Sequence, residues 1–278
     1  MSQPPSVPQR FLSEISRHLT LSFTDIADHP LILGIFGPPG EGKTFQLRAA
    51  LAALRVHSTT INAADLESDR AGQPGKMLLE HYVVAARDIE RGTPTVMVIN
   101  DIDTTVGEWE KHTGTVNHQQ LLAQLMHLAD SPAHIPRVGP VRRVPVIVTG
   151  NDFTKLYAPL RRPGRMKAIA WLPTIEEKHA VLLTMFAGIA TEQTVKELCE
   201  HYYRLPVSFF SQLKVEALGM MASTVLRQIS NYEEVVRNPA RYATYIMAAA
   251  SADSIDLLKL AADMVRNGDA VHRPYLEQ

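Results

Sequence analysis

The stretch Gly37-Pro38-Pro39-Gly40-Glu41-Gly42-Lys43-Thr44 decides the fold, because it fits the phosphate-loop pattern G-x-x-x-x-G-K-[ST]. Glycines in such a loop let backbone amides approach phosphate oxygens closely. Lys43 would bring positive charge to the β and γ phosphates, and Thr44 would offer its hydroxyl to Mg²⁺. We expect these eight residues and the following Phe45 to bind ATP. The stretch therefore predicts a strand, a phosphate loop and a helix that points the positive end of its dipole at the phosphates.

Apolar segments on both sides of the loop predict an α/β domain. The segment 31–36 before the loop is suited to a buried strand, and a helix over 44–54 follows with no internal breaker. Short segments rich in β-branched residues predict further parallel strands around 57–61, 95–99, 144–149 and 168–172. Helical patterns over 76–91 and 116–129 alternate with these strands. The alternation implies a central parallel sheet covered by helices on both faces.

The two ends of the chain have helical patterns. Residues 1–9 are typical of a flexible tail, and residues 10–23 have the apolar spacing of one amphipathic helix. After Pro173 the periodicity predicts helices over 175–186, 191–203, 207–229 and 240–265. We therefore predict three parts: an N-terminal tail and leader helix (1–30), an α/β nucleotide-binding domain (31–173) and an all-helical lid domain (174–278).

The composition indicates a folded protein of the cytoplasm. Hydrophobic residues make up 45% and charged residues 21%, as in soluble globular proteins. The formal net charge of −1 gives no global attraction to nucleic acid or to anionic lipid, so we expect neither partner. Cys199 is the single cysteine, which excludes an intramolecular disulfide and a cysteine metal cage. We find no signal peptide and no stretch of membrane-spanning length.

Polar residues follow two of the predicted strands. The strand over 95–99 leads into Asn100-Asp101-Ile102-Asp103, where a carboxylate could bind Mg²⁺ through water or position an attacking water. Asn151 follows the strand over 144–149, and the basic cluster 161–165 precedes the last strand. Taken singly, an Asn after a strand is usually a turn residue and an arginine cluster is usually a solvated face. The order of the acidic strand end, Asn151 and the arginine cluster along the chain indicates that these residues have a function.

That order resembles the layout of AAA+ ATPases: phosphate loop, acidic strand end, Asn after the next strand, Arg-x-x-Arg, helical lid. More narrowly, the chain resembles Rubisco activases of the green and cyanobacterial type. The similar stretches are Gly40 to Gln46, Asp65-Leu66-Glu67-Ser68, Ala71-Gly72-Gln73-Pro74, Ile99 to Asp103, Ala129-Asp130-Ser131-Pro132, and Val144 to Phe153 continuing through Leu156 to Leu160. The likeness covers about 31–173 and weakens in the lid.

The resemblance implies specific roles. Lys43 and Thr44 would hold ATP and Mg²⁺, and Asp101 and Asp103 would be the acidic strand-end residues that bind the metal. Asp101 would also be catalytic, and Asn151 would be the sensor that orients water. Arg162 and Arg165 match arginine fingers, which reach the nucleotide of a neighbouring subunit and imply a homo-oligomeric ring, most often a hexamer. The implied activity is ATP-driven remodelling of a protein client, with Rubisco that holds an inhibitory sugar phosphate as the best candidate.

Three departures from the family pattern leave alternatives open. Asn100 stands where most AAA+ proteins have Asp, a variation that Rubisco activases share. Lys214 occupies the lid position where activases carry Arg, and Gly114 replaces the Tyr expected in the second pore loop over 109–116. We therefore also consider an activase-like ATPase with another client, a nucleotide-regulated scaffold that hydrolyses little ATP, and a P-loop kinase. The arginine pair and the long helical end argue against the kinase.

Overall fold

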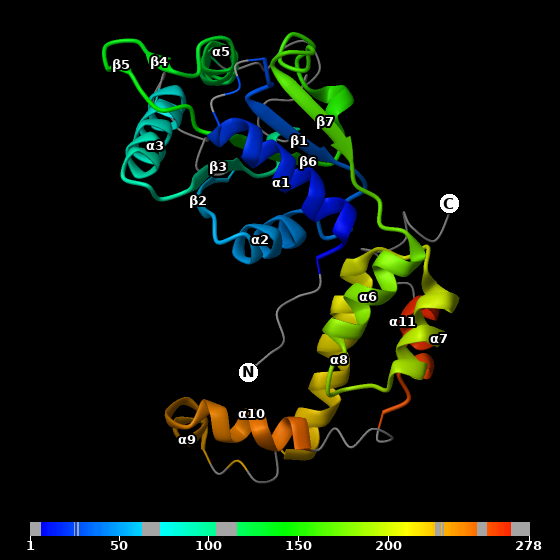
Figure 1. Cartoon of the computed structure of the whole chain (residues 1–278). Coiled ribbons are helices and arrows are strands. Elements are labelled where there is room, and N and C mark those ends of the chain that lie inside the picture. The colour runs from blue at the N-terminus through cyan, green and yellow to red at the C-terminus, as the bar shows by residue number, and fades with distance from the viewer. Residues whose placement is uncertain are drawn as a thin grey trace. The chain divides into compact units, whose positions relative to one another are not determined.

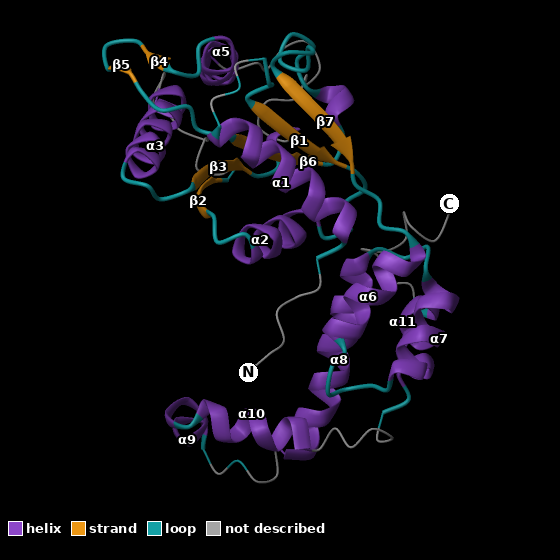
Figure 2. Cartoon of the chain, in the orientation of Figure 1, coloured by secondary structure: helices purple, strands orange, loops and turns teal. Residues whose placement is uncertain are grey.

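Two compact units make up the part of the chain that the computed structural model describes, which comprises residues 7–24, 26, 28–62, 73–103, 116–225, 229, 231–248 and 255–267. The first unit, Gln9–Leu172, contains the sheet, and the second begins at Pro173 and is helical (Figures 1 and 2). None of the helices in these ranges combines the length and apolar composition that a bilayer span requires. The predicted segments 65–68 and 109–114 lie outside the described residues.

The first unit is built on five parallel strands, which confirms the predicted fold class. They are β1 (Ile32–Phe36), β2 (His57–Ile61), β3 (Thr95–Ile99), β6 (Val146–Gly150) and β7 (Met166–Ala170), in the spatial order β2-β3-β6-β1-β7. Every residue of β3 and β6 is buried, as expected of inner strands covered on both faces. Because all five strands are parallel, the carboxyl ends of β1, β3 and β6 meet at one edge of the sheet.

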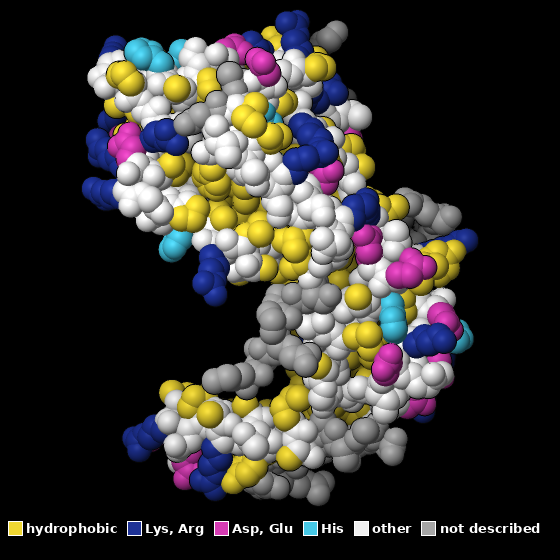
Figure 3. All heavy atoms as spheres, in the orientation of Figure 1, with side chains coloured by type: hydrophobic (Ala, Val, Ile, Leu, Met, Phe, Trp, Pro, Cys, Tyr) yellow, Lys and Arg dark blue, Asp and Glu magenta, His cyan; other side chains and the backbone are white. Residues whose placement is uncertain are grey.

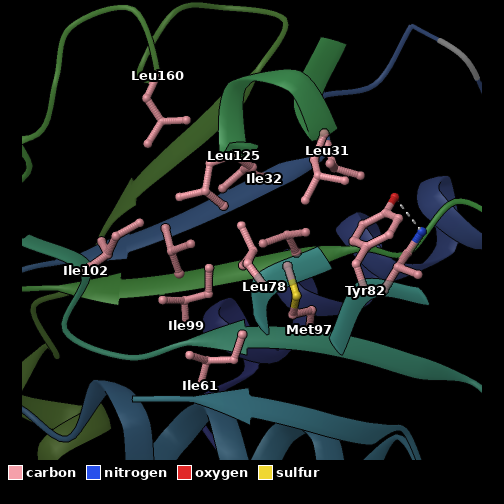
Figure 4. Packing of buried hydrophobic residues seen from close by; sticks show 14 of the residues in the cluster. Leu31, Ile32, Ile61, Leu78, Tyr82, Met97, Ile99, Ile102, Leu125 and Leu160 are labelled. Carbon is pink, nitrogen blue, oxygen red and sulfur yellow. Dashed lines mark hydrogen bonds between the residues drawn. The ribbon is translucent and has the colours of Figure 1, made fainter. Parts of the chain in front are cut away.

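Helices cover both faces of this sheet. They are α1 (Gln9–Phe23), α2 (Lys43–Ala53), α3 (Gln73–Glu90) and α5 (Val116–Asp130), with a small hairpin of β4 (His134–Ile135) and β5 (Gly139–Pro140) and a 3-10 turn η2 (Phe153–Lys155) between strands. Leu78 and Tyr82 of α3 and Leu125 of α5 pack with Ile32 and Met97 on one face (Figure 4). On the opposite face, Leu47 and Leu51 of α2 lie beside Val98.

The position of α1 differs from the predicted separate leader over 1–30. The helix belongs to the α/β unit, because Phe11, Ile15 and Leu19 are buried along one stripe. Phe11 also contacts Trp171 edge to face, with ring centroids 4.7 Å apart. The amphipathic pattern identified the helix correctly, but it could not indicate which surface the apolar stripe would cover.

The second unit consists of helices around their own apolar core. They are α6 (Ile175–Met185), α7 (Glu192–Tyr202), α8 (Val207–Val225), α9 (Tyr232–Arg237), α10 (Pro239–Ala248) and α11 (Leu257–Arg266). Phe186, Phe209 and Phe210 are among the buried residues of this core. The helix predicted over 240–265 is instead two helices, since Asp256 accepts a hydrogen bond from the backbone N–H of Lys259 and caps the start of α11.

Charged side chains of both signs are interspersed on the surface that Figure 3 shows, where basic groups lie among acidic ones. This distribution fits the near-zero formal net charge of the sequence.

Candidate nucleotide site

The phosphate loop joins β1 to α2 through backbone conformations that favour glycine. Gly40 and Gly42 have φ angles of 80° and 77°, in the left-handed region. Gly42 caps α2 without any side-chain hydrogen bond, so the first backbone N–H groups of α2 have no partner within the helix. At Gly37, a Cβ atom would lie 2.1 Å from the backbone oxygen of Trp171. The loop thus presents a helix N-terminus suited to an anion, and a larger residue at position 37 could not fit.

Lys43 lies at the centre of the site with its ammonium group fully engaged. Its Nζ donates to the backbone oxygens of Gly37 (2.8 Å) and Pro38 (2.9 Å) and to Oδ1 of Asn151 (2.9 Å). The side chain is 6% exposed, and burial lowers its pKa, while the carboxylates of Asp101, Asp103 and Glu41 oppose that shift. The lysine therefore links the phosphate loop to the loop after β6.

Asn100 and Asp101 follow β3 at this edge of the sheet. Asn100 is buried; its Nδ2 donates to Oδ1 of Asn62 (3.1 Å), and its Oδ1 accepts from the hydroxyl of Thr149 (3.3 Å). Asp101 is exposed and has a φ angle of 52°, a conformation that Asp tolerates better than most residues. Its backbone N–H donates to Oγ1 of Thr149 (3.3 Å). The side-chain amide of Asn100 therefore links the ends of β2, β3 and β6, whereas Asp101 is exposed.

Asp103 is buried, in contrast to Asp101. One carboxylate oxygen, Oδ2, accepts hydrogen bonds from the backbone N–H groups of Asn151 (2.8 Å) and Asp152 (2.9 Å). The side chain is 6% exposed. The structure thus brings together three residues that the sequence predicted for the site, Lys43, Asn151 and Asp103, although they lie far apart along the chain. The assignment of Asp101 and Asp103 as metal ligands stays a prediction.

Trp171, which follows β7, contacts the phosphate loop. The indole N–H of Trp171 donates to the backbone oxygen of Glu41 (3.0 Å), and the guanidinium of Arg10 lies 5.1 Å from the centre of the indole ring. Glu41 is buried, while Phe45 on the first turn of α2 is 56% exposed. The contact of Trp171 with the loop was not predicted from the sequence. The signal was weak, since an aromatic residue after an edge strand is usually core.

The two predicted finger arginines differ in their surroundings. Arg165 makes a two-pronged bridge to Asp130, with Nε to Oδ1 at 2.7 Å and Nη2 to Oδ2 at 2.6 Å, and its Nη1 donates to the backbone oxygen of Pro159 (2.9 Å). This bonding lowers the pKa of Asp130 and raises that of Arg165. Arg162 is exposed, and its side chain makes no hydrogen bond within the described ranges. Of the two arginines, Arg165 could reach another molecule only by breaking its ion pair with Asp130, whereas Arg162 has no such pair to break among the described residues.

Lys214, the predicted lid contact, lies on α8 in the helical unit, where its side chain is partly exposed. The neighbouring aromatic pair Phe209 and Phe210 is buried in the core of that unit. Its role as a phosphate contact stays a prediction.

Comparison with known proteins confirms the resemblance noted in the motifs. The chain is 38% identical over 239 residues to the ribulose bisphosphate carboxylase/oxygenase activase of Anabaena sp. (82% of this chain, 57% of the relative) and 39% identical over 218 residues to that of Nostoc sp. (75% and 53%). It is 38% identical over 214 residues to the chloroplastic activase of Malus domestica (73% and 49%). The chain spans about half the length of these relatives.

A family model described as "ATPase family associated with various cellular activities (AAA)" matches residues 33–174. The match begins inside β1 and ends at Thr174, the residue that caps α6, so the loop, both polar strand ends and the arginine pair all lie within it. Family membership also implies that the chain binds nucleotide. The chain belongs to the AAA family of ATPases.

Proposed function

We propose that the chain hydrolyses ATP at the carboxyl edge of its sheet and uses the energy to remodel a protein client. The observation that carries this proposal is the placement of Lys43, whose ammonium bridges the phosphate loop and Asn151. Such a bridge joins the group that binds phosphate to the group that would orient the attacking water. The N-terminus of α2, which Gly42 caps without a side-chain hydrogen bond, lies beside this lysine and is suited to an anion.

The side chains of this site divide the catalytic work as follows. Lys43 would exchange its three acceptors, the backbone oxygens of Gly37 and Pro38 and Oδ1 of Asn151, for β and γ phosphate oxygens. This exchange would release the side-chain amide of Asn151 to orient water. The exposed carboxylate of Asp101 polarises that water in the transition state. Mg²⁺, when bound, would neutralise charge that develops on the transferred phosphoryl group, with the Thr44 hydroxyl and acidic groups as its protein ligands.

Assembly into a ring is part of the proposal. Arg162, which is exposed, would reach the nucleotide of a neighbouring subunit and neutralise transition-state charge. Arg165, which pairs with Asp130, would shape the loop that presents Arg162 and complete the charge at the boundary. We propose a homo-oligomer, with a hexamer as the expected ring. The proposed compartment is the cytoplasm, consistent with the single buried cysteine.

Rubisco that holds an inhibitory sugar phosphate is the client we propose. The support comes from similarity to Rubisco activases of other organisms, at 38–39% identity. The test mixes purified protein, ATP and Mg²⁺ with Rubisco whose active sites are occupied by ribulose bisphosphate, and follows the recovery of carboxylation. Recovery that requires ATP and fails with Lys43→Ala supports the proposal.

Two outcomes of this test would redirect the proposal. ATP hydrolysis without recovery of Rubisco would indicate another client. Nucleotide binding with negligible hydrolysis would favour a scaffold, for which Asn100 and its neutral hydrogen bonds to Asn62 and Thr149 give a specific reason.

A further inference from the structure

The carboxylate of Asp103 is buried beneath the loop that carries Asn151, and each of its oxygens has a distinct environment. Oδ2 accepts from the backbone N–H groups of Asn151 (2.8 Å) and Asp152 (2.9 Å). Oδ1 is buried and accepts no hydrogen bond from the described residues. A Cβ atom on Gly150 would lie 2.6 Å from Oδ1 and 2.7 Å from Cε1 of Phe153. The carboxylate is therefore packed against the end of β6, in space that exists because position 150 is glycine.

We propose that Asp103 is a positioning residue that fixes the backbone at 151–152 so that the Asn151 side chain reaches the phosphate site. The inference rests on the proposed ATP hydrolysis and deepens it. It assigns the two acidic residues after β3 to different tasks: Asp101 acts on water or metal from an exposed position, and Asp103 acts through the loop after β6.

Geometry favours this role over direct metal binding by Asp103. A carboxylate oxygen has two lone-pair sites, and two backbone N–H groups use both sites of Oδ2. Oδ1 lies against the Cα of Gly150, where even one added carbon would collide with it. Neither oxygen therefore has room for a metal ion with its shell of further ligands. Asp101, in contrast, is exposed.

The same contacts explain how Asp103 would influence the reaction. Hydrogen bonds from backbone amides to a buried carboxylate are charge-assisted and therefore strong and directional. They fix the residue whose side-chain Oδ1 accepts from Lys43 Nζ at 2.9 Å. A catalytic side chain displaced by about 1 Å can cost about 10² in rate. We thus expect loss of Asp103 to lower kcat about 10²-fold with a much smaller change in KM for ATP.

The first test measures the loop directly and requires no activity. Amide hydrogen exchange of the full-length chain should show the Asn151 and Asp152 amides protected in the wild type and exposed to exchange in Asp103→Ala. Asp103→Asn keeps one acceptor oxygen and should retain part of the protection. Asp88→Asn, which removes a half-exposed surface carboxylate on α3, is the matched control and should leave these amides unchanged. Unchanged protection in Asp103→Ala would overturn the proposal.

The second test is a double-mutant cycle with Asn151. If Asp103 acts through Asn151, then Asp103→Ala should lower kcat far less in an Asn151→Ala background than in the wild type. The Mg²⁺ concentration that gives half-maximal activity should stay unchanged in Asp103→Asn, which should also keep more activity than Asp103→Ala. Additive losses in kcat, or a shifted Mg²⁺ requirement in Asp103→Asn, would refute the positioning role.

The two tests separate this inference from the proposed function. A wild-type chain without ATP hydrolysis would refute the proposed function, and hydrogen exchange would still decide whether Asp103 fixes the loop. If the wild-type chain hydrolyses ATP but the losses in kcat from Asp103→Ala and Asn151→Ala are additive, only the inference is refuted. If Asp103→Ala fails to fold, Asp103→Asn carries both measurements, with thermal unfolding as the check on integrity.

Discussion

Mild acid should destabilise the α/β unit through His18, a buried residue of α1. The side chain is 2% exposed, its ring lies 4.8 Å from that of His29, and Arg143 donates from its guanidinium to the backbone oxygen of His29. Burial, followed by the nearby charges of His29 and Arg143, lowers the pKa of His18 from 6.5 to about 3. The folded protein therefore keeps this ring neutral under conditions where an unfolded chain protonates it.

The size of the effect follows from this difference in pKa. Between pH 6.5 and about 3 the unfolded state binds a proton at His18 that the folded state does not bind. The stability that neutral His18 contributes is therefore fully present above pH 6.5 and is lost as the pH falls toward 3. From pH 7 to pH 5 the loss from this one group is roughly 2 kcal/mol, and the full difference is on the order of 4–5 kcal/mol. Typical domains have a stability of about 5–15 kcal/mol, so the loss is a large fraction of the total.

Urea unfolding followed by circular dichroism at pH 7 and pH 5 measures this loss. His18→Leu fills similar space without a titrating group, so it should remove most of this loss of stability. A smaller remainder should come from His29, because burial also lowers the pKa of that residue. His57→Leu, a change at an exposed histidine at the start of β2, is the control and should keep the wild-type loss. An equal loss of stability in wild type and His18→Leu would refute the reasoning.

Three further predictions concern the catalytic groups. Asp101→Asn should bind ATP but stop hydrolysis, because we propose that the carboxylate of this exposed residue acts on water or metal in the transition state; retained turnover in a steady-state assay would contradict this. Arg162→Ala should leave the stability to urea unchanged and reduce ATP turnover by about 10³-fold to 10⁵-fold. Activity should partly return when Arg162→Ala subunits are mixed with Lys43→Ala subunits. Mixed rings that stay inactive after verified subunit exchange would exclude action of Arg162 across the subunit boundary. Arg165→Ala should lower the free energy of unfolding by about 1 kcal/mol, a value discounted for partial exposure of its bridge to Asp130, and a double-mutant cycle with Asp130→Ala that shows no coupling would argue against it.

Local sequence patterns predicted the elements of the sheet well. The segments 57–61 and 95–99 are strands with the predicted bounds, because short β-branched runs between breakers leave little choice. The last strand begins at Met166, two residues before the predicted start at 168. It is an edge strand whose residues alternate in exposure, so its apolar pattern is weaker than that of β3 or β6. The strand order was not predictable, since β1 pairs with β6 and β7 through contacts over 100 residues apart.

The candidate site was predictable in its members but not in their contacts. The motif identified Lys43, and the order of motifs identified Asn151, yet only the fold brings their side chains to 2.9 Å. The sequence pattern predicted that Asp101 and Asp103 both bind the metal, and it could not indicate that Asp103 is buried while Asp101 is exposed. The bridge from Arg165 to Asp130 joins residues 35 positions apart, which no local pattern encodes.

ATP hydrolysis by the wild-type chain and by Lys43→Ala, both verified as folded by circular dichroism, tests the central claim most directly. Lys43 supplies the ammonium that bridges the phosphate loop and Asn151, so its loss leaves β and γ phosphate charge uncompensated. The account predicts phosphate release by the wild type and none above background by Lys43→Ala. Wild-type rates from a folded Lys43→Ala protein would contradict it.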